Sequence, residues 1–294
     1  MPDGTLSPEH GLIERIQRRI DELVEGDIDD SGKTAVSHFA KVACVRELRL
    51  RLVPFFEPCV IFVLSGTKHL GEKQVKAGGC LAVPAPANFH MTNVVDNVSG
   101  EYVALVFPFD VDDINHVRAA LGHPLKGHGL SKELVTFDTD VEALEALDHY
   151  LQSGVEDSEA RVTHRKREIL LILAERNPAI LDLGLGCADW TQKLRAIFAE
   201  EPSKAWALDE VCDRLAVSDS TLRRHLKGED TSFRDVLSEF RLGNALMDLL
   251  MSKAPIYRVA HDNGFQSVSR FSENFRKRYG ATPTELRTKL PESG

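Results

Sequence analysis

Two groups of polar side chains in the last third of the chain are of the residue types that contact DNA. The first group comprises Ser220, Thr221, Arg223, Arg224 and Lys227, and the second comprises Ser269, Arg270, Ser272, Glu273, Arg276 and Lys277. Arginine and lysine donate hydrogen bonds to guanine edges and to phosphates, and a glutamate can accept from the cytosine amino group. For either group alone, a solvated helix face is an equally good interpretation.

An internal repeat favours the DNA interpretation. The capping and apolar positions Ser218, Leu222 and Leu226 recur at a constant offset as Ser267, Phe271 and Phe275. Chance would have to supply both copies in register, so a repeated supersecondary unit is a stronger indication than either copy alone.

Each copy predicts a helix, a tight turn and a second helix. Ser218 and Ser267 are suited to the N-cap of the second helix, and Gly228 and Gly280 are suited to end it. Gly264 supplies the turn of the second copy. The two predicted helix-turn-helix units span about residues 206–228 and 255–280, and each would present one polar group on its second helix.

One long helix is predicted between the copies. It begins after Ser232, which forms a capping box with Asp235, and continues to about Met251. About 19 residues at ~1.5 Å per residue give a length of roughly 28 Å. Since successive major-groove faces of B-DNA lie ~34 Å apart, a rod of this length could place both second helices in adjacent major grooves.

This stretch resembles the DNA-binding domain of the AraC/XylS family of bacterial transcription regulators. The resemblance covers about 85 residues and is carried by the following positions: Trp206 and Leu208; Ser218, Ser220, Leu222 and Arg224; Thr231, Ser232 and Phe233; Arg241 and Ala245; Val259 and Ala260; Gly264, Phe265 and Ser267; Phe271 and Phe275; Gly280, Thr282, Pro283 and Arg287. Two positions depart from the family pattern. Cys212 stands where a small alanine is usual, and Glu273 stands where many members carry arginine, so the family's base preference is not carried over to it.

Composition divides the chain into an acidic part and a basic part. The formal net charge is −9, yet residues 203–294 contain 15 Lys+Arg and 13 Asp+Glu, so the acidity belongs to residues 1–202. The five cysteines, Cys44, Cys59, Cys80, Cys187 and Cys212, occur singly, which indicates buried thiols in a reducing compartment. The chain shows neither a signal peptide nor an apolar run of ~18 residues, and we expect a cytoplasmic protein without a membrane partner.

The N-terminal part predicts a small antiparallel barrel or sandwich with flanking helices. The spacing of Leu12, Ile16 and Ile20 predicts a helix, and Leu48, Leu50 and Leu52 alternate with arginines as in a strand. Continuous apolar runs at residues 59–64 and 102–107 predict two more strands. We therefore expect an α+β protein with a barrel domain at 1–140, a helical dimerisation and linker region at 141–202, and an all-α DNA-binding domain at 203–294, with two helix-turn-helix motifs joined by a long helix.

Residues 57–110 are similar to the cupin-like N-terminal domain of AraC-type regulators, in which the barrel binds a small effector or serves in dimerisation. A metal-dependent cupin enzyme is the alternative, since Gly79 and His90 resemble part of a cupin metal motif. The corresponding stretch offers only His69 instead of a His-x-His pair, so His38, His69 and His90 are interpreted as structural or surface residues. We expect no metal, no cofactor and no catalytic residue. Lys68 could meet an acidic effector, although solvated surface is its favoured location.

The favoured function is a sequence-specific transcription regulator, and the family resemblance implies a homodimer that works with RNA polymerase. Activation is the expected mode, and the sequence does not distinguish it from repression. A stripe formed by Leu144, Leu147 and Leu151 is either core or the dimer interface. The run Ser220-Thr221-Leu222-Arg223-Arg224 is most similar to a branch that includes fatty-acid-responsive regulators, so a fatty acid or other apolar acid is the candidate effector. The second hypothesis is a regulator whose N-terminal domain only mediates dimerisation or protein docking.

Overall fold

The computed structural model describes residues 8–26, 39–124, 133–153, 158–183 and 189–291. Within these ranges, two antiparallel sheets form the N-terminal barrel. The larger sheet has the order β1 (Ala40–Cys44), β8 (Tyr102–Pro108), β3 (Cys59–Ser65), β6 (Gly79–Val83) and β9 (Val135–Asp138). The smaller sheet has the order β2 (Leu48–Phe55), β7 (Ala87–Val94), β4 (Thr67–Leu70) and β5 (Lys73–Lys76). The predicted antiparallel barrel is confirmed.

The larger sheet is buried on both faces. In β3, Phe62 and Leu64 pack outward against helices, whereas Ile61 and Val63 face the barrel interior. Successive side chains of a strand point to opposite faces, so a strand covered on both sides becomes apolar throughout. This arrangement explains the continuous apolar run in the sequence.

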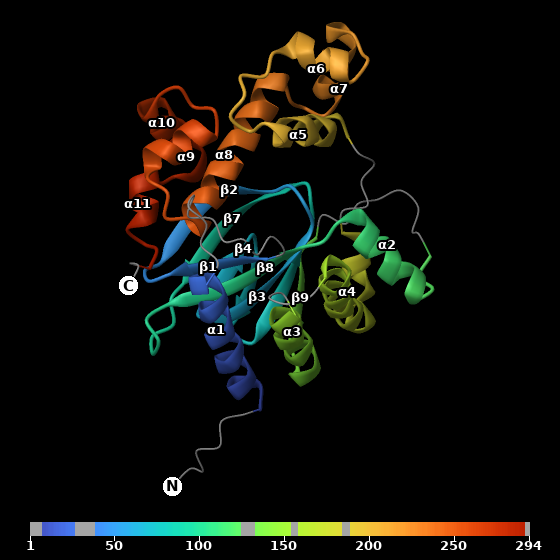
Figure 1. Ribbon diagram of the computed structural model, residues 1–294, viewed down its shortest axis with the longest axis vertical. Coiled ribbons are helices and arrows are strands. Elements are labelled where there is room, and N and C mark those ends of the chain that lie inside the picture. Colours follow the sequence, from blue (N-terminus) through green and yellow to red (C-terminus); the bar gives the residue numbers. More distant parts are fainter. Residues whose placement is uncertain (1–7, 27–38, 125–132, 154–157, 184–188, 292–294) are drawn as a thin grey trace.

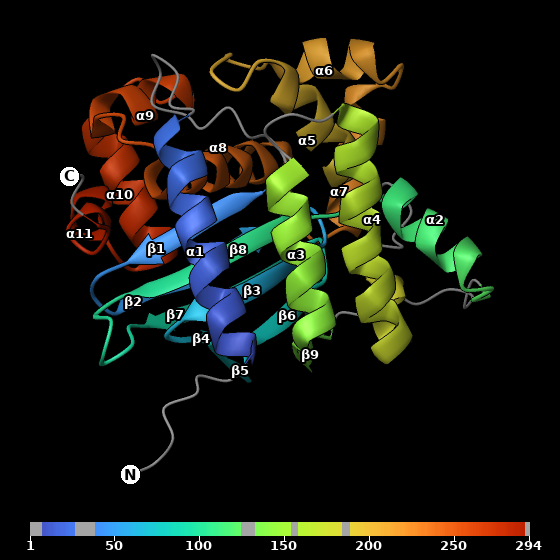
Figure 2. The same ribbon diagram turned by 60° about the horizontal axis from the view of Figure 1, so that its bottom comes forward.

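Helices cover the outer face of the larger sheet. Helices α1 (Pro8–Gly26), α3 (Val141–Ser153) and α4 (Glu159–Arg176) lie side by side across it (Figure 2). Helix α2 (Val111–Ala120) packs against α4, and a short 3-10 helix, η1 (Pro178–Asp182), follows α4. Ile16 and Ile20 of α1 have no exposed surface, as expected from their helical spacing.

The leucine stripe of α3 belongs to the core. Leu144, Leu147 and Leu151 are at most 1% exposed and pack in the same cluster as α1 and the larger sheet. Asp148 further ties α3 to α1 through ion pairs with Arg15 at 3.0 Å and Arg19 at 2.9 Å. The hypothesis that these leucines pair two protomers is therefore wrong for this structure, because their contacts are satisfied within one chain.

Strand β2 differs from its predicted alternation. Leu48 and Leu50 face the interior, but the register with β7 shifts between Leu50 and Val53. Leu52 lies in this bulge with φ of 48° and is 44% exposed, and Val53 takes the inward position at 8% exposure. A bulge inserts a residue and inverts the side-chain order beyond it, which periodicity alone does not reveal.

The C-terminal helices form two lobes joined by α8 (Phe233–Met251). One lobe contains α5 (Trp190–Glu200), α6 (Leu208–Arg214), α7 (Asp219–Gly228) and the first half of α8, which share a separate apolar cluster. The other contains the second half of α8, α9 (Ile256–Asp262), α10 (Val268–Tyr279) and α11 (Pro283–Arg287), and its core is continuous with the barrel interior. Helix α5 therefore packs with the first helix-turn-helix unit.

Most predicted helix boundaries are confirmed. Ser218 and Ser267 accept hydrogen bonds from Thr221 N and Arg270 N, and Gly264 and Gly280 have φ of 76° and 83°. The end of α7 differs, because Gly228 lies within the helix and Asp230, with φ of 54°, makes the left-handed turn. The Ser232 hydroxyl caps Asp235 N without the reciprocal backbone contact. No helix in the described residues is long and apolar enough to cross a membrane.

Candidate DNA interface and effector cavity

The outer face of α7 carries the first predicted group of DNA-contacting residues. Thr221 is half-buried near the N-cap, and the exposed members are Ser220, Arg223, Arg224 and Lys227. Arg223 forms an ion pair with Asp219 on the same helix. Arg224 has no ion pair with a described carboxylate, so its guanidinium, unlike that of Arg223, is available to a base or phosphate without loss of an ion pair.

Helix α10 presents the second predicted group. Ser272 is half-buried, and the exposed members are Ser269, Arg270, Glu273, Arg276 and Lys277. The sequence left two roles open for Glu273, the reading of a cytosine and the restraint of a neighbouring arginine. Among the described residues no ion pair joins Glu273 to Arg270 or Arg276. Both roles of Glu273 stay predictions.

Helix α8 separates the two units as expected. It contains 19 residues, which at ~1.5 Å per residue span roughly 28 Å. The two helix-turn-helix units lie at opposite ends of it (Figure 1). This separation is of the order of the ~34 Å between successive major-groove faces of B-DNA.

The two units are attached to the barrel in different ways. Phe271, Phe275 and Tyr279 of α10 are fully buried in the cluster that also fills the barrel, and α10 contacts β2. The first unit is instead held by α5, whose N-terminal amides of Trp190 and Thr191 donate to the Glu229 carboxylate at 2.8 and 3.0 Å. A carboxylate at a helix N-terminus is stabilised by the helix dipole as well as by these hydrogen bonds.

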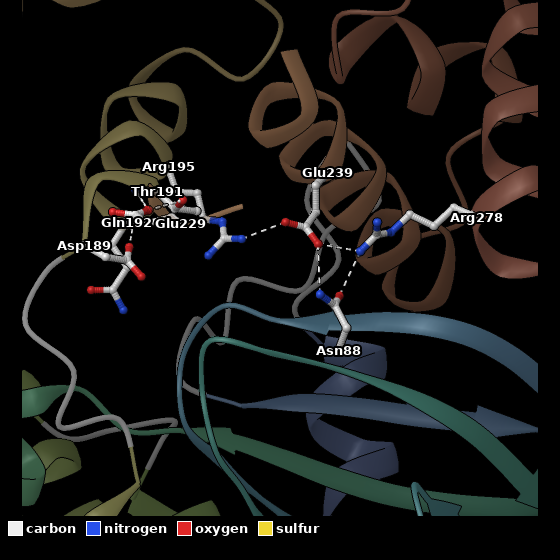
Figure 3. A network of polar contacts seen from close by, with 8 residues as sticks. All are labelled: Asn88, Asp189, Thr191, Gln192, Arg195, Glu229, Glu239 and Arg278. Atoms are coloured by element: carbon white, nitrogen blue, oxygen red, sulfur yellow. Dashed lines mark hydrogen bonds and ion pairs between the residues drawn. The ribbon is translucent and has the colours of Figure 1, made fainter. Parts of the chain in front are cut away.

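A carboxylate at the middle of α8 connects the barrel with both lobes (Figure 3). Glu239 accepts from Arg195 of α5 at 2.7 Å, from Arg278 of α10, and from the Asn88 amide of β7 at 3.1 Å. Its side chain is 17% exposed, and those of Arg195 and Arg278 are 12% and 22% exposed. We call Asn88, Arg195, Glu239 and Arg278 the Glu239 network. Sequence reasoning missed it, because its members lie far apart along the chain.

A cavity of about 670 Å³ extends from the barrel interior to α5 and α8. Its walls within the barrel include Ile61 and Met91, and its wall on α8 includes Phe240, Gly243 and Met247. Volumes of ~300–1,000 Å³ with mainly apolar walls are typical of small-molecule sites. The same cavity is therefore bounded by the barrel and by the helix that joins the two helix-turn-helix units.

Lys68 lies inside this cavity, contrary to the surface location favoured from the sequence. It is 3% exposed and donates to Asn93 Oδ1 at 3.1 Å. Burial lowers the pKa of its ammonium to about 8. Strand alternation accounts for the correction, since Lys68 and Leu70 share the inward face of β4 while His69 points outward and is half-buried.

The histidines give no sign of a metal centre in the described part of the chain. His69 and His90 lie on different strands, and His38 is outside the described residues. Groups of three or more potential ligands are absent from the described residues. Cys44, Cys59, Cys80 and Cys212 are free and buried, and Cys187 is not among the described residues. Burial raises the pKa of Cys44 to about 11 and that of Cys59 to about 12, so both thiols are neutral at physiological pH.

Comparison with known proteins supports the predicted helix-turn-helix domain. Residues 211–289 match a family of helix-turn-helix domains. The urease operon transcriptional activator of Escherichia coli is 37% identical over 102 residues, which are 35% of this chain and 34% of that protein. The chain carries the DNA-binding domain of the AraC/XylS family. The regulator YdeO of E. coli K12 is 33% identical over 135 residues, 44% of this chain and 53% of YdeO, so the chain spans only about a third to half of the length of these curated relatives.

The fold of the chain is similar to that of ToxT from Vibrio cholerae. A ToxT crystal structure has a TM-score of 0.63 at 14% sequence identity and covers 87% of this chain and all of ToxT. A second, with bound unsaturated fatty acid, has a TM-score of 0.60 and covers 86% of this chain and 96% of ToxT. At this identity the likeness shows a shared two-domain fold.

Proposed function

We propose that this protein is a sequence-specific DNA-binding transcription regulator controlled by a small, mainly apolar effector in the cavity between the barrel and α8. The observation that supports the proposal best is the position of the cavity. One of its walls belongs to α8, the helix that sets the spacing of the two helix-turn-helix units. A bound effector would therefore contact the helix on which the spacing of the DNA contacts depends. A fatty acid bound to the structurally similar ToxT supports an apolar acid as the effector class.

The DNA contacts proposed are the exposed polar groups on α7 and α10 described above. Both relatives are transcription regulators by name, which supports a regulatory and non-enzymatic role. Activation through contact with RNA polymerase and function as a homodimer belong to the same proposal. Because the leucines of α3 are buried, a dimer would have to use another surface.

The proposal is tested in two steps with the full chain. Selection of binding sites from random DNA identifies a preferred sequence, and its affinity is then measured as salt is varied. We expect affinity to fall steeply with salt, because both recognition helices neutralise phosphates. Failure to enrich any sequence would contradict the DNA-binding role.

The second step screens metabolites, including long-chain acids, by thermal denaturation. A ligand at 100 times its Kd stabilises the folded state by about 2.7 kcal/mol. A stabilising ligand that also changes affinity for the selected DNA supports control by an effector. Specific DNA binding that no ligand alters would favour the alternative, in which the N-terminal domain is a dimerisation or docking module.

A further inference from the structure

Lys68 and Tyr102 line the inner part of the cavity, and Asn93 is hydrogen-bonded to Lys68. The Lys68 ammonium has three N–H groups, and its acceptor among the described residues is Asn93 Oδ1. The Asn93 amide nitrogen and the Tyr102 hydroxyl are buried and have no hydrogen-bond partner among the described residues. Lys68 Nζ lies 5.8 Å from the centroid of the Tyr102 ring. We call Lys68, Asn93 and Tyr102 the donor cluster.

The donor cluster has no compensating negative charge. Within the described residues, no carboxylate lies within ion-pair distance of Lys68. The two acidic residues of the cavity lining, Glu57 and Asp110, are both exposed and therefore lie on its solvent side. The thiols of Cys44 and Cys59 also act on Lys68, but their raised pKa values keep them neutral. An uncompensated buried ammonium is costly, and an anion that enters this space removes the cost.

We infer that the donor cluster binds the carboxylate of a monocarboxylic acid whose apolar tail extends through the cavity to α8. A carboxylate has about four acceptor positions, which suit donors from an ammonium and a phenol better than a neutral carbonyl does. The inference rests on the proposed effector cavity and adds the chemical class and orientation of its occupant. The acid enters head first, and the end of its tail contacts Phe240 and Met247.

The reverse orientation has a weaker basis. Arg195 also lines the cavity, and its Nε and Nη1 atoms are buried without a hydrogen-bond partner among the described residues. Its positive charge, unlike that of Lys68, is already paired, because Nη2 lies 2.7 Å from the Glu239 carboxylate. A carboxylate placed there would compete with Glu239 and lie on the side of the exposed Glu57 and Asp110, which repel it. Arg195 therefore provides a matched control for Lys68, because both are cations of the same cavity.

The test measures binding of straight-chain acids, from octanoic to octadecanoic acid, and of their methyl esters to the full chain by calorimetry. For wild type, we expect the best acid to bind about tenfold to hundredfold more tightly than its ester, because the ester lacks the charged acceptor. Lys68→Met should remove this preference by lowering the affinity for the acid to about that for the ester. Arg195→Met should keep the preference.

Three outcomes would overturn the inference: equal binding of acid and ester by wild type, a preference that survives Lys68→Met, and a preference lost only in Arg195→Met. Binding of esters alone, or of both without preference, leaves the effector cavity in place and rejects only the carboxylate site. If neither acids nor esters bind, the effector cavity is rejected as well. The DNA-binding role is then still tested separately, by selection of binding sites from random DNA. If Lys68→Met fails to fold, Tyr102→Phe carries the test, with a severalfold loss expected for the acid alone.

Discussion

Replacement of Glu239 by glutamine should destabilise the protein far more than replacement of a surface carboxylate. The variant Glu239→Gln keeps the side-chain shape but leaves Arg195 and Arg278 as largely buried cations without their common anion. The Nε atoms of both arginines already have no hydrogen-bond partner among the described residues, so the lost contacts are not readily replaced. Hydrogen bonds to charged groups contribute about 1.5–3 kcal/mol each, and removal of one partner of a buried pair costs about 3–5 kcal/mol.

We expect Glu239→Gln to lower the free energy of unfolding by about 3 kcal/mol, which for a chain of this size lowers Tm by roughly 6–12 °C. The matched control is Glu200→Gln, because Glu200 pairs with Arg214 at the surface and is 58% exposed. Exposed pairs contribute about 0–1 kcal/mol. Calorimetry of both variants, together with a double-mutant cycle of Glu239→Gln and Arg278→Met, measures the network directly. Equal Tm shifts for the two glutamine variants, or a coupling energy within about 0.5 kcal/mol of zero, would refute this account of the Glu239 network.

Three further predictions concern other parts of the protein. Arg224→Ala and Arg270→Ala should each weaken binding to the selected DNA by about 1–3 kcal/mol, measured by titration at fixed salt, because each removes a base-edge donor. Gly243→Ala should lower stability by about 1–3 kcal/mol in thermal denaturation, because a Cβ there would lie 2.7 Å from the Phe56 ring. The affinity for a long-chain acid should fall about tenfold per pH unit above about pH 8, because Lys68 loses its proton there.

Each of these predictions has its own control. Arg223→Ala should cost less than Arg224→Ala, since Arg223 is held by Asp219; equal losses would contradict the assigned roles. Gly228→Ala should raise stability by about 1 kcal/mol, because nothing lies within 4 Å of a Cβ at that helical position. A Tm increase for Gly243→Ala would contradict this prediction, because it would mean that the Phe56 ring moves aside at little energetic cost.

In the ligand-free protein, the contribution of Lys68 to folding stability changes with pH in the opposite direction to the affinity for an acid. The pKa of Lys68 is lowered from 10.5 to about 8 in the folded state. The unfolded chain therefore binds more protons between these pH values, and the contribution of Lys68 to stability becomes more favourable as pH rises through this window. Affinity for an acid should fall over the same window, and ester binding should not change. An acid affinity that is constant from pH 7 to about pH 10 would contradict a role for the ammonium.

The sequence predicts those features whose causes are local. Caps at Ser218 and Ser267, left-handed glycines at Gly264 and Gly280, and the extent of α8 each depend on a few neighbouring residues, and all agree with the structure. The turn after α7 differs, because Gly228 and Asp230 can each end a helix and local preference does not decide between them.

Features that depend on residues far apart in the chain cannot be predicted from local sequence patterns. From the sequence, Leu144 fits core better than a dimer interface but is compatible with both, and its packing in the cluster shared with α1 shows that it belongs to the core. The inward position of Lys68 has a signal in the alternation with Leu70, but a lysine inside a barrel contradicts the usual surface preference of its side chain. Glu239 has partners 151 residues away at Asn88 and 39 residues away at Arg278, which no periodicity indicates.

The unequal attachment of the two lobes determines where an effector can act. The α10 lobe shares its apolar core with the barrel, so a shift of α10 relative to β2 would open that core. The α7 lobe has a separate core and reaches the barrel through the cavity wall and the Glu239 network. Because an occupant of the cavity contacts α8 at Phe240 and Gly243, next to Glu239, it acts where the two lobes join. We therefore expect an effector to change the position of α7 relative to a fixed α10, and hence the spacing at which the protein reads two major grooves.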